Sequence, residues 1–383
     1  MHDVAGPASG LPFIRTNPGA TPRPLRIAQV APLYEAVPPR LYGGTERIVA
    51  HLTDVLVQLG HEVTLFASAD ARTRAKLVPV RDQAIRLDPA PLKSDLAAHL
   101  SLLHTVRQRQ HEFDVLHFHT DLLHFPFFAD VAERTVTTVH GRLDLKDLAG
   151  AYARWPQFPL VSISNDQRRP LPEASWCATI QHGIAVDRAA FTAVPQVEPY
   201  LAFLGRISPE KRPDRAIELA KRAGIPLRIA AKVDAADKAY FHERIEPLLN
   251  HPLISYIGEI GDAEKPAFLG NARALLFPID WPEPFGLVMI EAMACGTPVI
   301  AWRCGSVPEV IDDGVSGFIV DTEEGALAAI ARLDELDRHM VRATFERRFT
   351  AEVMARNYLK LYWRLHRRLE PAGSRAIGLE RAI

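Results

Sequence analysis

Hydrophobic positions follow two different periods along the chain. Short runs such as Leu25–Ala31 and His61–Ser68 are rich in residues that favour strands, whereas Thr45–Leu59 places apolar residues three or four positions apart on one helical face. This alternation continues along the chain and predicts βαβ units around parallel sheets. We therefore expect an α/β protein. Further strands of a first unit are expected at 113–119, 135–140, 159–164 and 178–182.

A second set of alternating segments begins at Tyr200–Arg206, after the loose stretch Val186–Pro199. Two open sheets that face each other would leave a ligand-binding cleft between the carboxyl ends of their strands. The further strands of this second unit are expected at 226–232, 254–260, 274–279, 298–302 and 317–320. The resulting segments are a loose leader at 1–24, a first Rossmann-like domain at 25–190, a second one at 198–349, and a terminal helix with a tail at 350–383.

The terminal helix is predicted to be amphipathic. Met354, Tyr358, Leu361 and Leu365 share one helical face. We expect this face to pack back onto the first domain, with reversible attachment to an anionic membrane as the alternative. The opposite face carries the basic residues Arg356, Lys360, Arg364 and Arg367.

Charge and cysteine content argue against several classes of protein. The 383 residues include 45 Lys and Arg against 46 Asp and Glu, so the formal net charge is −1 and no global field attracts a nucleic acid. The three cysteines show no CxxC spacing and predict neither a disulfide framework nor a zinc site. No apolar stretch of about 18 residues predicts a membrane span. A cytoplasmic protein is expected.

The most informative stretch is Phe277–Trp302, which has the pattern strand, loop, helix and strand. Gly286 opens the helix, whose first main-chain N–H groups lack intrahelical partners and suit a phosphate or sugar oxygen. Glu291 is a single charge in an otherwise apolar helix, so it needs either a protein donor or a ligand donor such as a ribose diol. Glu283, in the loop before the helix, either accepts hydrogen bonds from sugar hydroxyls or is a surface acid.

The run EPFGLVMIE, followed by AMACGTPVIAWRCGSVPEVIDDGVSGFIV, closely resembles the retaining nucleotide-sugar glycosyltransferases of family 4. Three more stretches agree: YGGTE at 42–46, TVHG at 138–141 and LGRISPEK at 204–211. The resemblance covers 25–369 and implies the GT-B fold. In that fold two Rossmann-like, doubly wound parallel-sheet domains face a central cleft, and the C-terminal helix returns to the first domain.

The resemblance also implies roles for individual residues. Glu283 would bind hydroxyls of the transferred sugar, and Glu291 would hold the ribose. Arg206 and Lys211, otherwise solvated loop charges, would hold the donor diphosphate and supply positive charge as its bond breaks, without a metal. His140 would lie near the transferred sugar and, with Glu283, Arg206 and Lys211, make up the expected catalytic set. Main-chain contacts to the donor are expected from Gly43, Gly44, Phe285, Gly286 and Leu287.

Four histidines and one lysine have no settled role in the sequence. His117 and His119 share a strand face close to His124, but no acid or cysteine completes a metal-ligand set, so no metal site is expected. Lys232 stands where many relatives have a Gly-rich turn and could add a phosphate contact. His182 replaces a common asparagine and alters a cleft contact.

Other enzyme classes lack their fingerprints. The patterns GxGxxG and GxxxxGK are absent, which argues against a nicotinamide dehydrogenase and a P-loop phosphotransferase. No two aspartates are separated by a single residue, as metal-dependent glycosyltransferases of one domain require. A glycosidase that used Glu283 and Glu291 as acid and nucleophile would leave the basic pair without a task.

The resemblance implies transfer of a hexose, with UDP-glucose as the expected donor, to a hydroxyl acceptor with retention of configuration. No cofactor is expected beyond this co-substrate, and no metal is required. The acceptor would lie among first-domain loops at 34–44 and 119–128, where Phe125, Phe127 and Phe128 either stack on it or belong to the core. The alternative is a catalytically silent nucleotide-sugar-binding or scaffold protein of the same fold.

Overall fold

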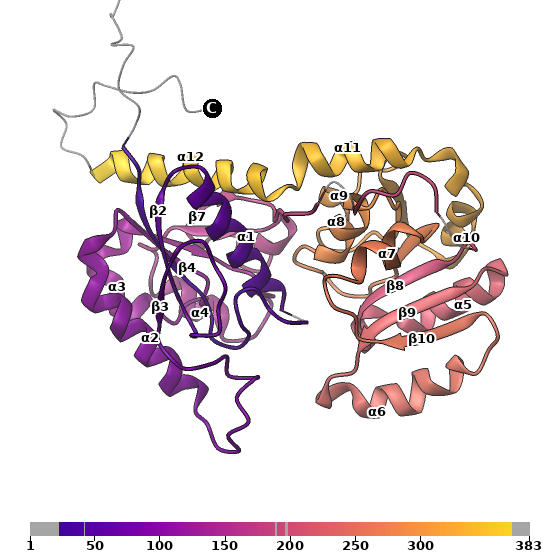
Figure 1. The fold of residues 1–383 in the computed structure, drawn as a ribbon, viewed down its shortest axis with the longest axis horizontal. Coiled ribbons are helices and arrows are strands. Elements are labelled where there is room, and N and C mark those ends of the chain that lie inside the picture. The colour runs from indigo at the N-terminus through magenta and orange to yellow at the C-terminus, as the bar shows by residue number, and fades with distance from the viewer. Residues whose placement is uncertain (1–22, 42, 188–189, 196–197, 370–383) are drawn as a thin grey trace, which may run out of the picture.

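The computed structural model describes residues 23–41, 43–187, 190–195 and 198–369, which form two parallel sheets (Figure 1). Within these residues the first sheet has seven strands in the order β3-β2-β1-β4-β5-β6-β7. The chain order reverses at β1, which is where doubly wound sheets bind ligands. The strands are β1 (Arg26–Val30), β2 (Glu62–Ala67), β3 (Lys76–Pro79), β4 (Val115–Phe118), β5 (Thr135–Thr138), β6 (Leu160–Ser162) and β7 (Trp176–Thr179).

The second sheet has six strands within the described chain, in the order β10-β9-β8-β11-β12-β13, and reverses at β8. Two doubly wound parallel-sheet domains are thus confirmed. Every predicted strand is present with ends shifted by a few residues. The second-sheet strands are β8 (Leu201–Arg206), β9 (Leu227–Lys232), β10 (Ile254–Gly258), β11 (Ala274–Phe277), β12 (Val299–Trp302) and β13 (Gly317–Val320).

The edge strand β3 is an element that the sequence pattern missed. Its four residues pair with β2 but are half-buried or exposed, and the last is a proline. Such a run lacks the apolar alternation that marks a strand, and proline is tolerated there because the strand lies at the edge. The pairing with β2, and not the local sequence, therefore defines this strand.

Helices connect the strands in both domains, and α1, α4, α7 and α8 contribute residues to the lining of the cleft. Helices α1 and α8 each begin directly after a glycine, Gly43 and Gly286, in the connections that follow β1 and β11. The α-helices among the described residues are α1 (Gly44–Gln58), α2 (Asp95–Arg109), α3 (Phe125–Phe128), α4 (Leu148–Ala153), α5 (Pro213–Ala223), α6 (Lys238–Tyr240), α7 (Lys265–Gly270), α8 (Leu287–Ala294), α9 (Val307–Val310), α10 (Glu323–Ala331), α11 (Arg338–Arg348) and α12 (Ala351–Leu369).

Two crossings between the domains run side by side. Ile184 forms a parallel bridge with Thr350, with its N–H on the carbonyl of Phe349 and its own carbonyl accepting from Ala351 N. A Cβ on Gly183 would lie 2.2 Å from the carbonyl oxygen of Thr350, so only glycine permits this approach. The paired crossings fix how the two domains meet.

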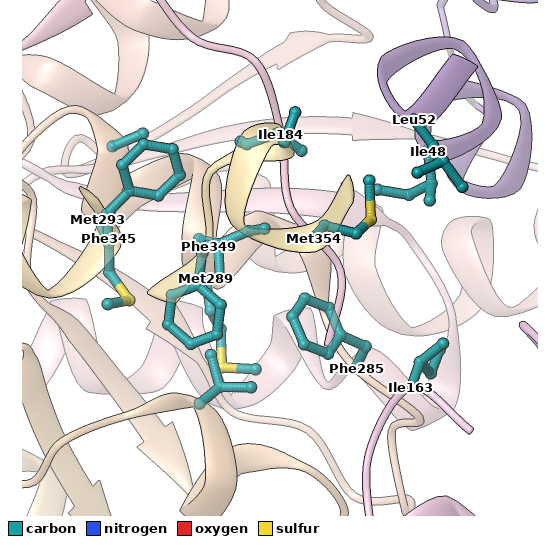
Figure 2. Packing of buried hydrophobic residues seen from close by; sticks show 14 of the residues in the cluster. Ile48, Leu52, Ile163, Ile184, Phe285, Met289, Met293, Phe345, Phe349 and Met354 are labelled. Carbon is teal, nitrogen blue, oxygen red and sulfur yellow. The ribbon is translucent and has the colours of Figure 1, made fainter. Parts of the chain in front are cut away.

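A continuous apolar cluster extends across this crossing. Figure 2 shows Met354 between Ile48 and Leu52 of α1 on one side and Phe349 on the other. The same cluster includes Met289 of α8. The core of the first domain is therefore continuous with the helix that lines the cleft in the second.

The terminal helix α12 lies along the first domain, as Figure 1 shows in yellow. Met354, Tyr358, Leu361 and Leu365 are all buried, which confirms the predicted apolar face and its return to the first domain. Because the first domain covers this face, the alternative of membrane attachment through it is not supported.

Two predicted segments fall largely outside the described residues. These are the leader, of which Arg23 and Pro24 are described, and the tail after Leu369. Across the described chain, no helix combines the length and the apolar character that crossing a membrane requires.

Candidate functional site

A cleft of about 770 Å³ lies between the carboxyl ends of the two sheets. Both domains contribute to its walls, and the loops after β1, β8 and β11 supply much of the lining. The structure brings together in this cleft every residue to which the sequence assigned a catalytic or donor-binding role: Gly43, Gly44, His140, Arg206, Lys211, Glu283, Phe285, Gly286, Leu287 and Glu291.

The N-terminus of α8 forms one wall of the cleft. Gly286 has φ 78° and precedes the first helical residue, Leu287. A Cβ on Gly286 would lie 2.8 Å from the Met289 side chain and 3.0 Å from the Phe277 ring, so glycine is required by both its conformation and its surroundings. Free N–H groups at this end give a positive potential that suits a phosphate or sugar oxygen.

The start of α1 approaches the start of α8 from the other domain. A Cβ on Gly44 would lie 3.4 Å from Leu287 Cδ1, which is van der Waals contact. Gly43 has φ 154° and leaves no room for a side chain, because a Cβ there would lie 2.7 Å from Pro39 Cβ. Two helix N-termini therefore face the same part of the cleft. Tyr42, the first residue of the YGGTE stretch, lies outside the described residues.

Glu283 and Lys211 form an ion pair in the cleft. The indole N–H of Trp281 also donates at 3.0 Å to Oε2 of Glu283, the same oxygen that Lys211 contacts. The Lys211 ammonium lies 5.3 Å from the Trp281 ring centroid and 5.6 Å from that of Phe277, within the range of cation–π attraction. A sugar and a diphosphate placed here would meet a carboxylate and an ammonium that are already in contact.

Arg206 is surrounded by acidic side chains at the end of β8. Its guanidinium lies 2.8 Å from Glu210 and 3.5 Å and 3.6 Å from Asp234 and Asp237. Lys232, at the end of the neighbouring β9, pairs with Asp234 at 2.9 Å. Burial tends to raise the pKa of Asp234, but the bonds from Lys232 and Arg206 outweigh it and lower that pKa. Both cations line the cleft next to carboxylates that a diphosphate would have to replace.

Glu291 finds its partners in the protein. Its Oε1 lies 2.8 Å from Lys265 Nζ and 3.2 Å from Arg47 Nη1. Arg47 reaches across from α1 in the first domain and also pairs with Asp262 at 2.5 Å. The sequence left open whether Glu291 pairs with a protein donor or with a ligand donor. The structure provides protein donors, so a ribose would have to share the carboxylate with them. Arg47 and Lys265 both line the cleft and were not identified from the sequence.

His140 lies just after β5, is half-buried and contacts the rings of His119 and His182. Its Nε2 is 2.9 Å from His119 Nδ1, and its ring lies against that of His182 with centroids 5.1 Å apart. His182 in turn meets Phe285 edge to face at 5.1 Å. Burial lowers the pKa of His140 to about 3, so this side chain is neutral at pH 7. The contact that His182 makes is therefore with the predicted cleft histidine.

The remaining histidines of the predicted cluster have structural partners. His117 bonds the Tyr362 hydroxyl at 2.7 Å and Thr138 Oγ1 at 2.8 Å. His124 bonds Thr137 Oγ1 at 3.1 Å and stacks on Phe118. The residues that the structure describes contain no group of three or more side chains arranged to hold a metal ion.

The first-domain side of the cleft is apolar in part. Phe125 and Phe128, two of the rings expected to stack on an acceptor or to belong to the core, are fully buried in the first-domain core, and Phe127 is not in the cleft lining. The exposed apolar side chains that line this part of the cleft are instead Tyr34, Leu41, Leu123 and Leu145.

Asp121 also lines this side and was missed by the sequence analysis. It has φ 48°, a backbone conformation that is unusual for a residue other than glycine and that clusters at functional sites. Asp121 is exposed to solvent, and its place within the cleft still desolvates the carboxyl enough to raise its pKa above the ordinary value. Its place after a strand, in a loop that the sequence already assigned to the acceptor, was the signal that could have found it.

Comparison with known proteins matches both halves of the chain to family models. Residues 42–176 match the model described as Glycosyltransferase Family 4, and residues 188–345 match Glycosyl transferases group 1. The phosphatidyl-myo-inositol mannosyltransferase of Mycolicibacterium smegmatis is 27% identical over 361 residues, covering 86% of this chain and 89% of that protein. The D-inositol 3-phosphate glycosyltransferase of the same organism is 34% identical over 146 residues, 35% of this chain and 31% of that protein.

Solved structures have the same fold. AviGT4, a glycosyltransferase involved in avilamycin A biosynthesis, aligns with TM-score 0.66 and 23% identity over 90% of this chain and 98% of its own. Anabaena Alr3699/HepE in complex with UDP and glucose aligns with TM-score 0.69 and 18% identity over 89% of this chain and 100% of its own. The chain therefore belongs to the family 4 glycosyltransferases, has their GT-B fold, and is an enzyme that uses a nucleotide-sugar donor.

Proposed function

We propose that this enzyme transfers a hexose from a nucleoside diphosphate sugar, with UDP-glucose as the first donor to test, to a hydroxyl acceptor and with retention of configuration. The observation that carries the proposal is the convergence of two cations, two carboxylates and a helix N-terminus on one cleft. Arg206, Lys211 and the start of α8 suit a diphosphate, and Glu283 and Glu291 suit sugar hydroxyls.

The ion pairs of the cleft explain how a donor would be held. The diphosphate brings negative charge to Lys211 and Arg206, which are now neutralised by Glu283, Glu210 and Asp234. As the sugar–phosphate bond breaks, charge grows on the leaving diphosphate and these cations stabilise it more strongly. Glu283, relieved of Lys211, can then accept hydrogen bonds from the transferred sugar. No metal ion is required for this charge balance.

The identity of the sugar has a second candidate. The relative from Mycolicibacterium smegmatis that matches most of this chain is named a mannosyltransferase, which favours a mannose donor. Glucose and mannose differ in configuration at one carbon, so the carboxylate of Glu283 and its neighbours must discriminate between them. A panel that contains UDP- and GDP-linked forms of both sugars decides between the two candidates.

Retention would follow if the leaving diphosphate oxygen deprotonates the acceptor on the same face of the sugar. Asp121 provides the critical test, because a carboxylate base on the acceptor side would instead favour direct inversion. General-base catalysis contributes about 10²-fold to 10⁴-fold. We expect Asp121→Asn to lower kcat by less than about 10²-fold. We also expect NMR of the product to show an α-linkage from an α-linked donor. A β-linked product from an α-linked donor would by itself contradict retention, and a loss of kcat in that range for Asp121→Asn would then identify Asp121 as the base.

The acceptor would enter from the first domain. The exposed apolar lining on the first-domain side of the cleft suits a hydroxyl compound with an apolar or aromatic part. This lining consists of Tyr34, Leu41, Leu123 and Leu145. The experiment that tests the function is incubation of the purified protein with nucleotide sugars and such acceptors, with detection of the released nucleoside diphosphate. Tight donor binding without release would favour the catalytically silent alternative.

A further inference from the structure

A chain of buried hydrogen bonds runs from His140 in the cleft to the terminal helix α12. His140 Nε2 lies 2.9 Å from His119 Nδ1, and His119 Nε2 lies 2.8 Å from Gln29 Oε1. The Gln29 amide then donates from its Nε2 to the Tyr362 hydroxyl at 3.3 Å. Gln29, His119 and Tyr362 are all buried, so water does not compete for these bonds.

The direction of the Gln29 amide determines where each proton lies. Because its Nε2 donates to Tyr362, its Oε1 is the acceptor for His119, and His119 must carry its proton on Nε2. Burial lowers the pKa of His119 well below its ordinary value, so this ring is neutral and its Nδ1 is an acceptor. His140 then donates to it from Nε2. The Nδ1 of His140 therefore holds no proton.

The other contacts of the chain fit the same direction. Tyr362 accepts from Gln29, so its own proton is available to His117 Nδ1 at 2.7 Å, and His117 Nε2 can donate to Thr138 Oγ1 at 2.8 Å. At the cleft end, His140 Nδ1 has no hydrogen-bond partner within the described part of the chain. A buried acceptor without a partner is costly unless a ligand supplies the donor.

We propose that Gln29, His119 and Tyr362 are positioning residues that fix His140 in the tautomer with its proton on Nε2, which leaves Nδ1 to accept a hydrogen bond from a hydroxyl of the transferred hexose. This inference rests on the proposed function, since it takes the ligand beside His140 to be the sugar. The chain holds protons in place and does not relay them, because its inner end at Tyr362 and His117 is fully buried.

The direct test replaces a single oxygen at the far end of the chain. Tyr362→Phe removes the acceptor of the Gln29 amide, which is then free to turn and donate to His119, and this reverses the protons as far as His140. Tyr358→Phe is the matched control: it removes a hydroxyl from the same helix, whose partner is Thr138 Oγ1 at 2.8 Å and which makes no bond to Gln29. The readout is the two-bond ¹H–¹⁵N correlation spectrum of the full-length chain labelled at histidine, with His140 assigned by its loss in His140→Gln.

We expect His140 to be protonated on Nε2 in the wild-type protein and in Tyr358→Phe, and to shift wholly or partly to the Nδ1-protonated form in Tyr362→Phe. A wild-type spectrum with the His140 proton on Nδ1, or an unchanged His140 in a folded Tyr362→Phe protein, overturns the proposal. These spectra need no activity, so they test the proton positions along this series of hydrogen bonds even if the wild-type protein transfers no sugar and the proposed function fails.

Kinetics at His119 give a second measurement that does not depend on the folding of Tyr362→Phe. His119→Leu removes the acceptor for His140, whereas His119→Asn retains a carbonyl oxygen close to the position of Nδ1. Loss of one hydrogen bond corresponds to a decrease of about 2-fold to 12-fold. We expect His119→Leu to lower kcat/KM for the nucleotide sugar in this range, His119→Asn to recover part of it, and the affinity for the free nucleoside diphosphate to stay unchanged in both. An equal loss of nucleoside diphosphate affinity, or no recovery in His119→Asn, contradicts a positioning role.

Discussion

Replacing Glu291 by glutamine tests whether this carboxylate holds the ribose of the donor. The substitution keeps the shape and two polar atoms but removes the charge that Lys265 contacts at 2.8 Å and Arg47 at 3.2 Å. Leaving a buried charge without a partner costs about 3 to 5 kcal/mol. Here both cations keep another carboxylate, because Asp262 lies 2.5 Å from Arg47 and 3.1 Å from Lys265. We therefore expect Glu291→Gln to fold, with a loss of unfolding free energy of about 1 kcal/mol.

Donor binding should fall more steeply than stability. A lost hydrogen bond to a charged group costs about 1 to 3 kcal/mol, which is about 5-fold to 150-fold in the dissociation constant. Titration calorimetry with UDP and with GDP measures this loss for the base that the wild-type protein prefers. Thermal unfolding of the same samples shows whether the variant is folded under the conditions of the titration.

Asp262→Asn is the matched control for this experiment. It removes a carboxylate from the same pair of cations, but Asp262 is half exposed and is not part of the cleft lining. We expect it to keep nucleoside diphosphate affinity close to that of the wild type. If Asp262→Asn loses as much affinity as Glu291→Gln, the effect comes from the charge of the cluster. If Glu291→Gln merely unfolds, the carboxylate is structural. Either result would refute the ribose role.

Three further predictions concern the diphosphate, metal ions and pH. Glu283→Gln removes the partner of Lys211, so turnover and discrimination between hexose donors should fall, while calorimetry should show an affinity for the free nucleoside diphosphate equal to or tighter than that of the wild type. Lys211→Ala and Arg206→Ala should weaken both turnover and nucleoside diphosphate affinity. Equal losses of nucleoside diphosphate affinity in Glu283→Gln and Lys211→Ala would make the assignment wrong. Chelation should leave turnover largely intact, whereas activity that is abolished by EDTA and restored by Mn²⁺ or Mg²⁺ would contradict a charge balance made by the protein alone. Burial raises the pKa of Glu46 from 4.5 to about 7, so the folded state binds the proton more tightly than the unfolded state and unfolding free energy should fall as pH rises through this window. Denaturant unfolding should show that the unfolding free energy falls between pH 5 and pH 8 by about 1 to 3 kcal/mol more in the wild type than in Glu46→Gln. Identical pH dependence in the two proteins would exclude Glu46 as the cause.

Local patterns predicted the elements of this fold well. The apolar stripe of α12 and the strand-like runs depend on neighbouring residues, and the structure buries Met354, Tyr358, Leu361 and Leu365 as expected. The role of Gly286 could be predicted because a glycine before an apolar helix indicates an exposed helix N-terminus. The strand β3 was missed because pairing with β2 defines it, and Phe125 and Phe128 could not be assigned to cleft or core because spacing alone does not distinguish the two.

The electrostatic partners of the site could not be predicted in the same way. Arg47 and Glu291 are 244 residues apart, and Gln29 and Tyr362 are 333 apart, so no periodicity connects them. Only the approach of the two domains and the return of α12 bring these groups together. The sequence identified the carboxylate that needed a partner, and the fold supplied Lys265 and Arg47.

The most direct test of the central claim is the release of nucleoside diphosphate by the wild-type protein and by Lys211→Ala. Both proteins are incubated with UDP- and GDP-linked glucose and mannose, with and without hydroxyl acceptors that carry an apolar part. We predict release by the wild-type protein that increases with an acceptor and falls at least about tenfold in Lys211→Ala, the loss expected when a charged group that stabilises the leaving diphosphate is removed. Binding of a nucleotide sugar without release above that of heat-denatured protein, under any of these conditions, would contradict the claim that this cleft transfers sugars.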